Sequence, residues 1–142
     1  MAEPIQSNRY KPGSPVPVFK EYGDLIQWRK GAIVNPLRTY LSLMNAHAVQ
    51  EYGRPIRITA LYKPGPFHET FEAGDVSANS AGDRGFFGDA SWDETTAAAF
   101  QAAIISDYKI PMILVHGGTP SAHWHVGPVA TLIYQRGKPS ED

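Results

Sequence analysis

Residues 112–137, MILVHGGTPSAHWHVGPVATLIYQRG, decide the fold of this chain. MILVHGG, residues 112–118, is a short apolar run followed by two glycines, which is typical of a buried strand. HWHVGPVATLIYQRG, residues 123–137, is rich in β-branched and aromatic residues and predicts another strand or a pair of strands. Strands that follow one another without a helix between them favour an antiparallel sheet.

The clearest helix lies upstream, in NPLRTYLSLMNAHAVQEYG, residues 35–53. Asn35 can cap this helix, Pro36 suits its first position, and Gly53 can end it. Apolar residues recur along it at helical spacing, so they predict one face that packs into the core: Leu37, Tyr40, Leu41, Met44 and Ala48.

A second helix is predicted from SWDETTAAAFQAAIISDYK, residues 91–109, and a strand from IRITALY, residues 56–62. Ser91 and Glu94 have the spacing of a capping box, and Pro111 closes the helix. Together with the consecutive strands at the end, these elements indicate an α+β fold. It would have a small antiparallel sheet with helices packed on one side.

The length and composition indicate one domain. A chain of 142 residues is long enough for one ordinary hydrophobic core and too short for two. Proline and glycine recur in residues 1–23 and predict an extended N-terminal arm, and residues 137–142 form a polar tail. The domain is therefore expected over residues 24–136, with a glycine-rich loop at 79–90 as a candidate edge for substrate contact.

Charge, cysteine content and hydropathy exclude several classes of protein. Thirteen Lys and Arg against fourteen Asp and Glu give a net charge of −1, without the basic patch of a nucleic-acid-binding protein. Because there is no cysteine, any metal must be held by His, Asp or Glu. Neither a signal peptide nor an apolar run long enough for membrane insertion is visible. We expect a monomer that is cytoplasmic as made, and an exported role would require lysis, a secretion machine or packaging in a phage particle.

The histidines are the candidate metal ligands. In HWH, residues 123–125, the outer two side chains project from the same face of a strand, while the tryptophan points to the other face. His68 and Asp75 can add a nitrogen and an oxygen ligand, a set that suits Zn²⁺ and leaves one position for water. His47 lies on the first predicted helix and is expected to be structurally incidental, whereas His116 could face the same cleft or cap a turn.

Two stretches together resemble a known family: ITALYKPGPFHETFEAGDVSA, residues 58–78, and HWHV, residues 123–126. The spacing H-x6-D, followed far downstream by HxH, resembles zinc metallopeptidases with the fold of D-alanyl-D-alanine carboxypeptidases, lysostaphin-type enzymes and hedgehog signalling domains. The resemblance covers about residues 35–130 and implies that fold for this chain.

The resemblance also implies roles for the matching residues. His68, Asp75 and His125 would bind zinc. His123 would lie beside the metal as a catalytic residue, and His116 is a second candidate for that role.

The implied activity is that of a zinc metallopeptidase, a hydrolase of peptide bonds in bacterial peptidoglycan. It would be a carboxypeptidase or an endopeptidase that degrades the cell wall as an endolysin does. Tyr62 and Lys63 fall where the carboxypeptidases have a Tyr-Arg pair that holds the substrate carboxylate. A lysine keeps the positive charge of that pair but loses the bidentate fork of arginine.

One departure from the family leaves an alternative open. The carboxypeptidases have a glutamate just before the final histidine motif, whereas Pro120, Ser121 and Ala122 carry no carboxylate. Either His123 is the general base, or the chain is a non-catalytic zinc module of the same fold that binds a peptide or a protein. A cupin is a third interpretation, but the order of its two motifs would be reversed.

Overall fold

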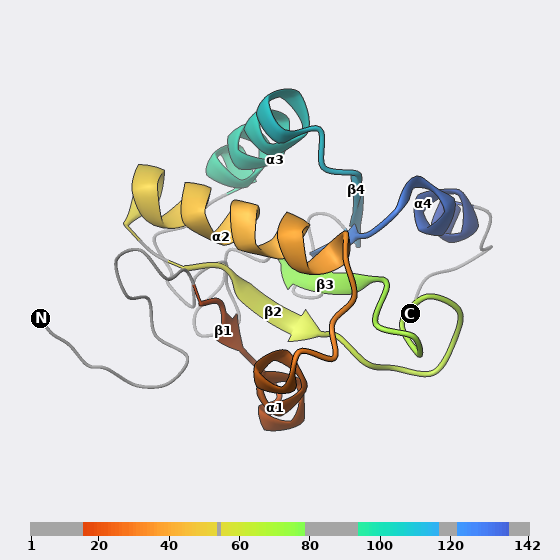
Figure 1. The fold of residues 1–142 in the computed structure, drawn as a ribbon. Helices are drawn as coiled ribbons and strands as arrows, with labels where there is room; N and C mark the ends of the chain where they lie inside the picture. The colour runs from red at the N-terminus through yellow and green to blue at the C-terminus, as the bar shows by residue number, and fades with distance from the viewer. Residues whose placement is uncertain (1–15, 54, 79–93, 117–121, 137–142) are drawn as a thin grey trace, which may run out of the picture.

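The structure, a computed structural model, describes residues 16–53, 55–78, 94–116 and 122–136, which form five strands and four helices (Figure 1). The strands are β1 (Val18–Phe19), β2 (Arg57–Ala60), β3 (Gly74–Ser77), β4 (Met112–Val115) and β5 (His123–Val126). The helices are α1 (Tyr22–Lys30), α2 (Leu37–Tyr52), α3 (Glu94–Tyr108) and α4 (Val129–Arg136). The fold is therefore α+β, as the sequence predicts.

The five strands form one mixed sheet in the order β1-β2-β3-β5-β4. All neighbours are antiparallel except β1 and β2, which run parallel, so the expected antiparallel sheet is corrected to a mixed one. The Val18 N–H donates to the Ile56 carbonyl at 2.9 Å, and the Lys20 N–H donates to the Ile58 carbonyl at 2.9 Å. The parallel pair arises because the chain crosses through two helices before it returns as β2.

The two faces of the sheet have different surroundings. One face packs against α2 and α3, which lie on the same side of the sheet (Figure 1). On this face the Trp124 ring lies 5.4 Å from the Phe100 ring of α3. Gly74 lies so close to α2 that a side chain at this position would contact Leu37 and Leu41. Asp75 and His125 alternate with these residues along β3 and β5, so they belong to the opposite face.

Helix α2 largely follows its sequence pattern. It ends at Gly53, which has a φ of 76° and leaves the helix in the left-handed conformation. Its start differs, since the helix begins at Leu37, and Asn35 accepts a hydrogen bond from the Thr39 hydroxyl at 3.0 Å instead of capping the backbone. The predicted apolar face packs into the core with Tyr40 partly buried and four residues fully buried: Leu37, Leu41, Met44 and Ala48.

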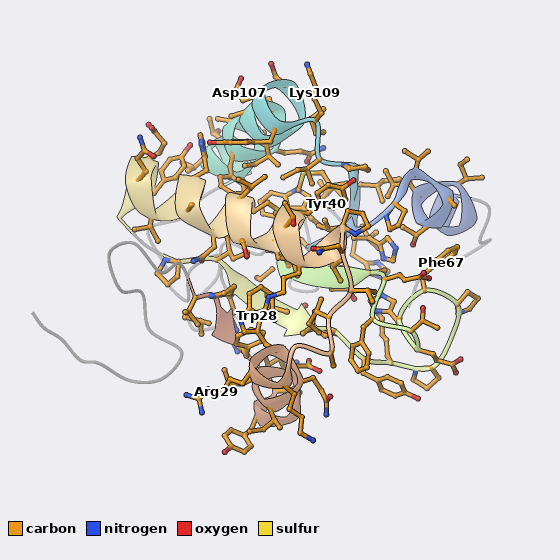
Figure 2. All side chains as sticks on the ribbon, viewed as in Figure 1. Trp28, Arg29, Tyr40, Phe67, Asp107 and Lys109 are labelled. Atoms are coloured by element: carbon orange, nitrogen blue, oxygen red, sulfur yellow. The ribbon has the colours of Figure 1, made fainter. Side chains whose placement is uncertain are left out.

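Helix α1 was not expected, because the first 23 residues are rich in proline and glycine. It is held by the buried Trp28, which lies between the helix and the rest of the core (Figure 2). The Trp28 ring is 5.6 Å from the Phe19 ring, and the Arg38 guanidinium carbon lies 4.0 Å from the centre of the Trp28 ring. Tertiary packing of this kind stabilises a nine-residue helix that would be marginal alone.

Helix α4 corrects the prediction of a further strand after HWHV. Strand β5 ends at Val126 and is followed by Gly127, where a Cβ atom would not fit because it would lie 2.6 Å from the Thr131 methyl group. The Thr131 N–H donates to the Pro128 carbonyl at 2.9 Å. This turn starts a helix in a segment whose β-branched residues had indicated a strand. Because Thr131 contacts His125, α4 meets the face of the sheet opposite α2 and α3, so the helices are not all on one side.

Several expectations lie outside the described residues: residues 1–15 of the arm, the loop 79–90, the Ser91 cap and the tail 137–142. None of the helices in the described part of the chain combines the length and the apolar character needed to cross a bilayer.

Candidate metal centre

Asp75 and His125 lie directly opposite each other on neighbouring strands. In the register of β3 and β5, Asp75 pairs with His125 and Ser77 pairs with His123. Side chains of directly opposite residues project side by side from one face. The His125 Nδ1 is 3.4 Å from Asp75 Oδ1, and the His123 Nε2 is 3.9 Å from Asp75 Oδ2. This confirms the prediction that the two histidines of HWH share a face.

His68 reaches the same carboxylate from the tight loop between β2 and β3. Phe67, on this loop (Figure 2), has a φ of 72°, which is uncommon for a bulky residue. Its carbonyl accepts the N–H groups of Glu72 at 2.7 Å and Ala73 at 3.1 Å, and these bonds close the loop. As a result His68 Nε2 lies 3.5 Å from Asp75 Oδ1, so the H-x6-D spacing does bring its two ends together.

The two atoms that face each other here lack hydrogen-bond partners. His68 Nδ1 lies 2.8 Å from the Leu61 carbonyl oxygen and must carry a proton, because a carbonyl can only accept. In a neutral imidazole, Nε2 therefore presents a lone pair to Asp75 Oδ1. Both atoms are buried without a hydrogen bond, an arrangement that calls for a cation or a proton between them.

The three side chains have the spacing of metal ligands. For bonds of about 2.0–2.1 Å in a tetrahedral site, neighbouring ligand atoms lie about 3.3 Å apart. The two distances from Asp75 Oδ1, to His125 at 3.4 Å and to His68 at 3.5 Å, are close to that value. Ligand atoms of all three lie within 4.8 Å of one another, and each residue is at most 6% exposed. His68, Asp75 and His125 thus form a buried group that could hold a metal ion.

Comparison of the chain with family models, with curated proteins and with solved structures gives no match.

The two oxygens of Asp75 have separate partners. Oδ1 faces His68 and His125, whereas Oδ2 faces the Lys63 ammonium at 2.8 Å and His123. Burial alone would raise the pKa of Asp75, but its side-chain contacts with His125 and His68, together with the electrostatic effect of His68 and His123, hold that pKa well below its ordinary value. Asp75 is therefore a carboxylate at neutral pH and ready to bind a cation.

The structure places His116 beside His123, Tyr62 at the surface and His47 against α3. The His116 ring is 6.0 Å from the His123 ring. Tyr62 is half exposed, with its ring 6.0 Å from the Phe71 ring. His47 instead contacts the hydroxyl of Tyr108 of α3 at 3.0 Å, in keeping with an incidental role.

The sequence did not indicate the residues that hold the two histidines. The Leu61 carbonyl accepts from His68, and the Thr131 hydroxyl contacts His125 Nε2. Metal-binding histidines ordinarily use their second nitrogen in this way, which fixes the tautomer and the ring orientation. A backbone carbonyl carries no sequence signal, but the Gly127–Pro128 turn could have indicated a helix that returns Thr131 to His125.

The Thr131→Val variant should bind zinc about ten- to a hundredfold more weakly than wild type, because it keeps the shape of the side chain and removes the acceptor for His125 Nε2–H. Competition with a chromophoric zinc chelator measures the affinity. The matched control is Thr39→Val, which deletes a hydroxyl on the exposed side of α2 and should leave the affinity unchanged. An affinity of Thr131→Val within twofold of wild type would show that the hydroxyl does not support the metal.

Proposed function

We propose that the chain is a zinc-dependent peptidase that hydrolyses peptide bonds of bacterial peptidoglycan. The observation that carries the proposal is the buried pair of atoms, His68 Nε2 and Asp75 Oδ1, that face each other without a hydrogen bond beside His125. Two imidazoles and one carboxylate are a ligand set found in catalytic zinc sites, which keep a fourth position for water or substrate. The chain has no cysteine that would complete a closed structural site.

The metal would be held by His68 Nε2, His125 Nδ1 and Asp75 Oδ1. Bound Zn²⁺ supplies Lewis-acid chemistry, since it lowers the pKa of water and polarises a carbonyl group. His123 is the candidate proton carrier because its Nε2 reaches Asp75 Oδ2 at 3.9 Å and so lies at the edge of the ligand group. From there it could accept a proton from water and deliver it to the leaving amine.

Lys63 is the candidate contact for a substrate carboxylate, with Tyr62 beside it. The Lys63 side chain is 37% exposed, and its ammonium nitrogen lies 2.8 Å from Asp75 Oδ2. A substrate carboxylate could therefore approach Lys63 from solvent while the ammonium stays on Oδ2. The same contact leaves Oδ1 as the oxygen directed at the metal, because Oδ2 is already paired.

The resemblance of the two motif stretches to cell-wall peptidases supplies the substrate class. Peptidoglycan stem and cross-bridge peptides are the substrates that this resemblance implies, and the fold proposed with it is that of the D-alanyl-D-alanine carboxypeptidase and hedgehog group. The buried ligand group, on the face of the small sheet opposite α2 and α3, is compatible with that proposal.

The alternative is a non-catalytic zinc module that binds a peptide or a protein. It is favoured by the lack of a carboxylate at Pro120, Ser121 and Ala122, where the carboxypeptidases have their general base. In the described group, Asp75 is the one carboxylate, and it serves as a ligand. Catalysis therefore depends on whether a histidine can replace that base.

Metal analysis together with a digest of purified peptidoglycan separates the two functions. We expect one zinc per chain in protein resupplied with zinc, a lower unfolding temperature after chelation, and new peptide ends detected by mass spectrometry. Zinc without new products would favour the binding module. Zinc well below one equivalent would contradict both.

A further inference from the structure

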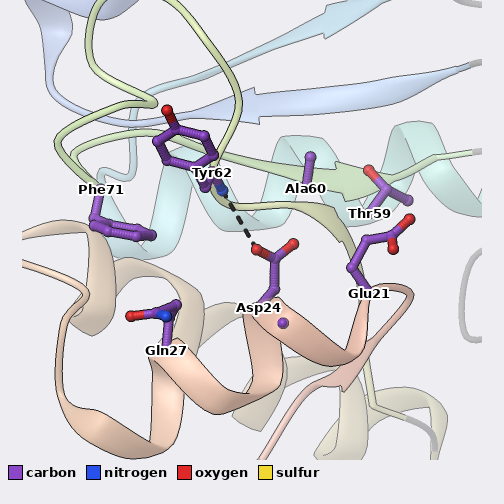
Figure 3. A pocket seen from close by; sticks show the side chains of 8 residues that line it. Glu21, Asp24, Gln27, Thr59, Ala60, Tyr62 and Phe71 are labelled. Atoms are coloured by element: carbon purple, nitrogen blue, oxygen red, sulfur yellow. Dashed lines mark hydrogen bonds between the residues drawn. The ribbon is translucent and has the colours of Figure 1, made fainter.

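Asp24 is a buried carboxylate outside the ligand group. It lies in the first turn of α1, is 6% exposed, and forms part of the wall of a pocket with Glu21, Gln27 and Tyr62 (Figure 3). Its Oδ2 accepts the N–H of Leu61 at 3.0 Å, and its Oδ1 accepts the N–H of Tyr62 at 3.4 Å. The carboxylate thus holds two consecutive N–H groups just past the end of β2.

The second of these N–H groups belongs to the peptide whose carbonyl holds His68. The N–H of Tyr62 and the C=O of Leu61 form one planar peptide group, and in a trans peptide they point in opposite directions. On one side the peptide donates to Asp24, and on the other it accepts from His68 Nδ1 at 2.8 Å. Two hydrogen bonds therefore connect Asp24 through the peptide group to the His68 ring, whose Nε2 lies beside Asp75.

Anchoring of α1 alone does not account for a carboxylate at this position. Leu25 and Trp28 already bury an apolar face of α1, and Trp28 packs on both Phe19 and Arg38. An apolar side chain would add to that packing, whereas a buried carboxylate costs free energy unless it is well hydrogen-bonded. What Asp24 adds is a fixed position and orientation for the peptide between Leu61 and Tyr62.

We propose that Asp24 is a positioning residue of the metal centre. By fixing the Leu61–Tyr62 peptide, it holds the Leu61 carbonyl where it keeps His68 in the Nδ1–H tautomer, with Nε2 directed at Asp75 and His125. The negative charge of Asp24 also polarises the peptide, so its carbonyl is a better acceptor for His68. The inference rests on the proposed metal centre. It adds α1 to the elements that hold the ligands in place, because Asp24 lies on α1, 44 positions before His68 in the sequence.

The test is the isosteric variant Asp24→Asn in the full chain, with Asp107→Asn as control. Asp107 is exposed near the end of α3 (Figure 2), so its variant makes the same chemical change away from the site. In the same orientation an asparagine has one oxygen and one NH₂ group, so it accepts one of the two N–H groups and places a donor against the other. We expect Asp24→Asn to bind zinc about ten- to a hundredfold more weakly, to show an altered Co²⁺ absorption spectrum, and to lose the single Nδ1–H tautomer of His68 in nitrogen-15 NMR of metal-free protein. Asp107→Asn should match wild type in all three.

The proposal is overturned if Asp24→Asn lowers the unfolding temperature but keeps wild-type zinc affinity, Co²⁺ spectrum and His68 tautomer, because Asp24 then only ties α1 to the sheet. If the variant does not fold, nitrogen-15 NMR of the metal-free wild type still tests the proposal. A neutral His68 imidazole that is protonated at Nε2 contradicts it. If wild type binds no zinc, the proposed function fails, whereas the tautomer measurement continues to test Asp24.

Discussion

The His125→Ala variant should lose most of its zinc and should no longer gain thermal stability when zinc is added. His125 is one of three ligands in a buried group, so its removal should weaken binding by more than the ten- to hundredfold that loss of a supporting residue costs. Zinc at about a thousandfold excess over Kd stabilises a protein by about 4 kcal/mol. In a chain of this size that is roughly 8–16 °C in unfolding temperature. Thermal unfolding with zinc or with a chelator measures the difference.

The matched control is His47→Ala. His47 is a half-buried histidine that contacts Tyr108 and Phe100 on α3 rather than the ligand group. Its variant should unfold at a lower temperature than wild type and keep the full zinc-induced rise. If His125→Ala also keeps the full rise, the metal is not held by this group.

The parts of the fold and site that could be predicted from the sequence rest on local patterns. The apolar face of α2 repeats at helical spacing within 12 residues, and it is buried as expected. The alternation in HWH has a period of two on a strand, which places His123 and His125 on one face and Trp124 in the core. In both cases the backbone geometry of a single element fixes which side chains point together.

The parts that could not be predicted depend on contacts between distant segments. Asp24 and Leu61 are 37 positions apart, and nothing in α1 itself indicates that its carboxylate would meet the end of β2. Thr131 is only six positions from His125, but its approach requires a helix where the β-branched residues indicated a strand. Tertiary packing overrode local preference in both segments.

The His123→Ala variant should keep its zinc and lose at least about a hundredfold in the rate of peptide hydrolysis, as expected when a general acid–base group is removed. His123 reaches Asp75 Oδ2 at 3.9 Å but is not one of the three residues whose ligand atoms converge. Its removal should therefore spare the metal and remove the proton carrier. Rates on a synthetic stem peptide, measured beside zinc content and unfolding temperature, separate a catalytic defect from a structural one.

His116→Ala provides the comparison, because its ring lies 6.0 Å from the His123 ring and His116 is not one of the three residues whose ligand atoms converge. We expect it to keep both zinc and most of the activity, since a group that transfers protons must reach the reacting atoms. If His116→Ala abolishes turnover with zinc retained while His123→Ala does not, His116 takes the catalytic role. If neither change affects hydrolysis, the proton carrier is another group. The absence of a carboxylate at Pro120, Ser121 and Ala122 makes this comparison decisive, because a histidine must then supply the base or the centre binds metal without turnover.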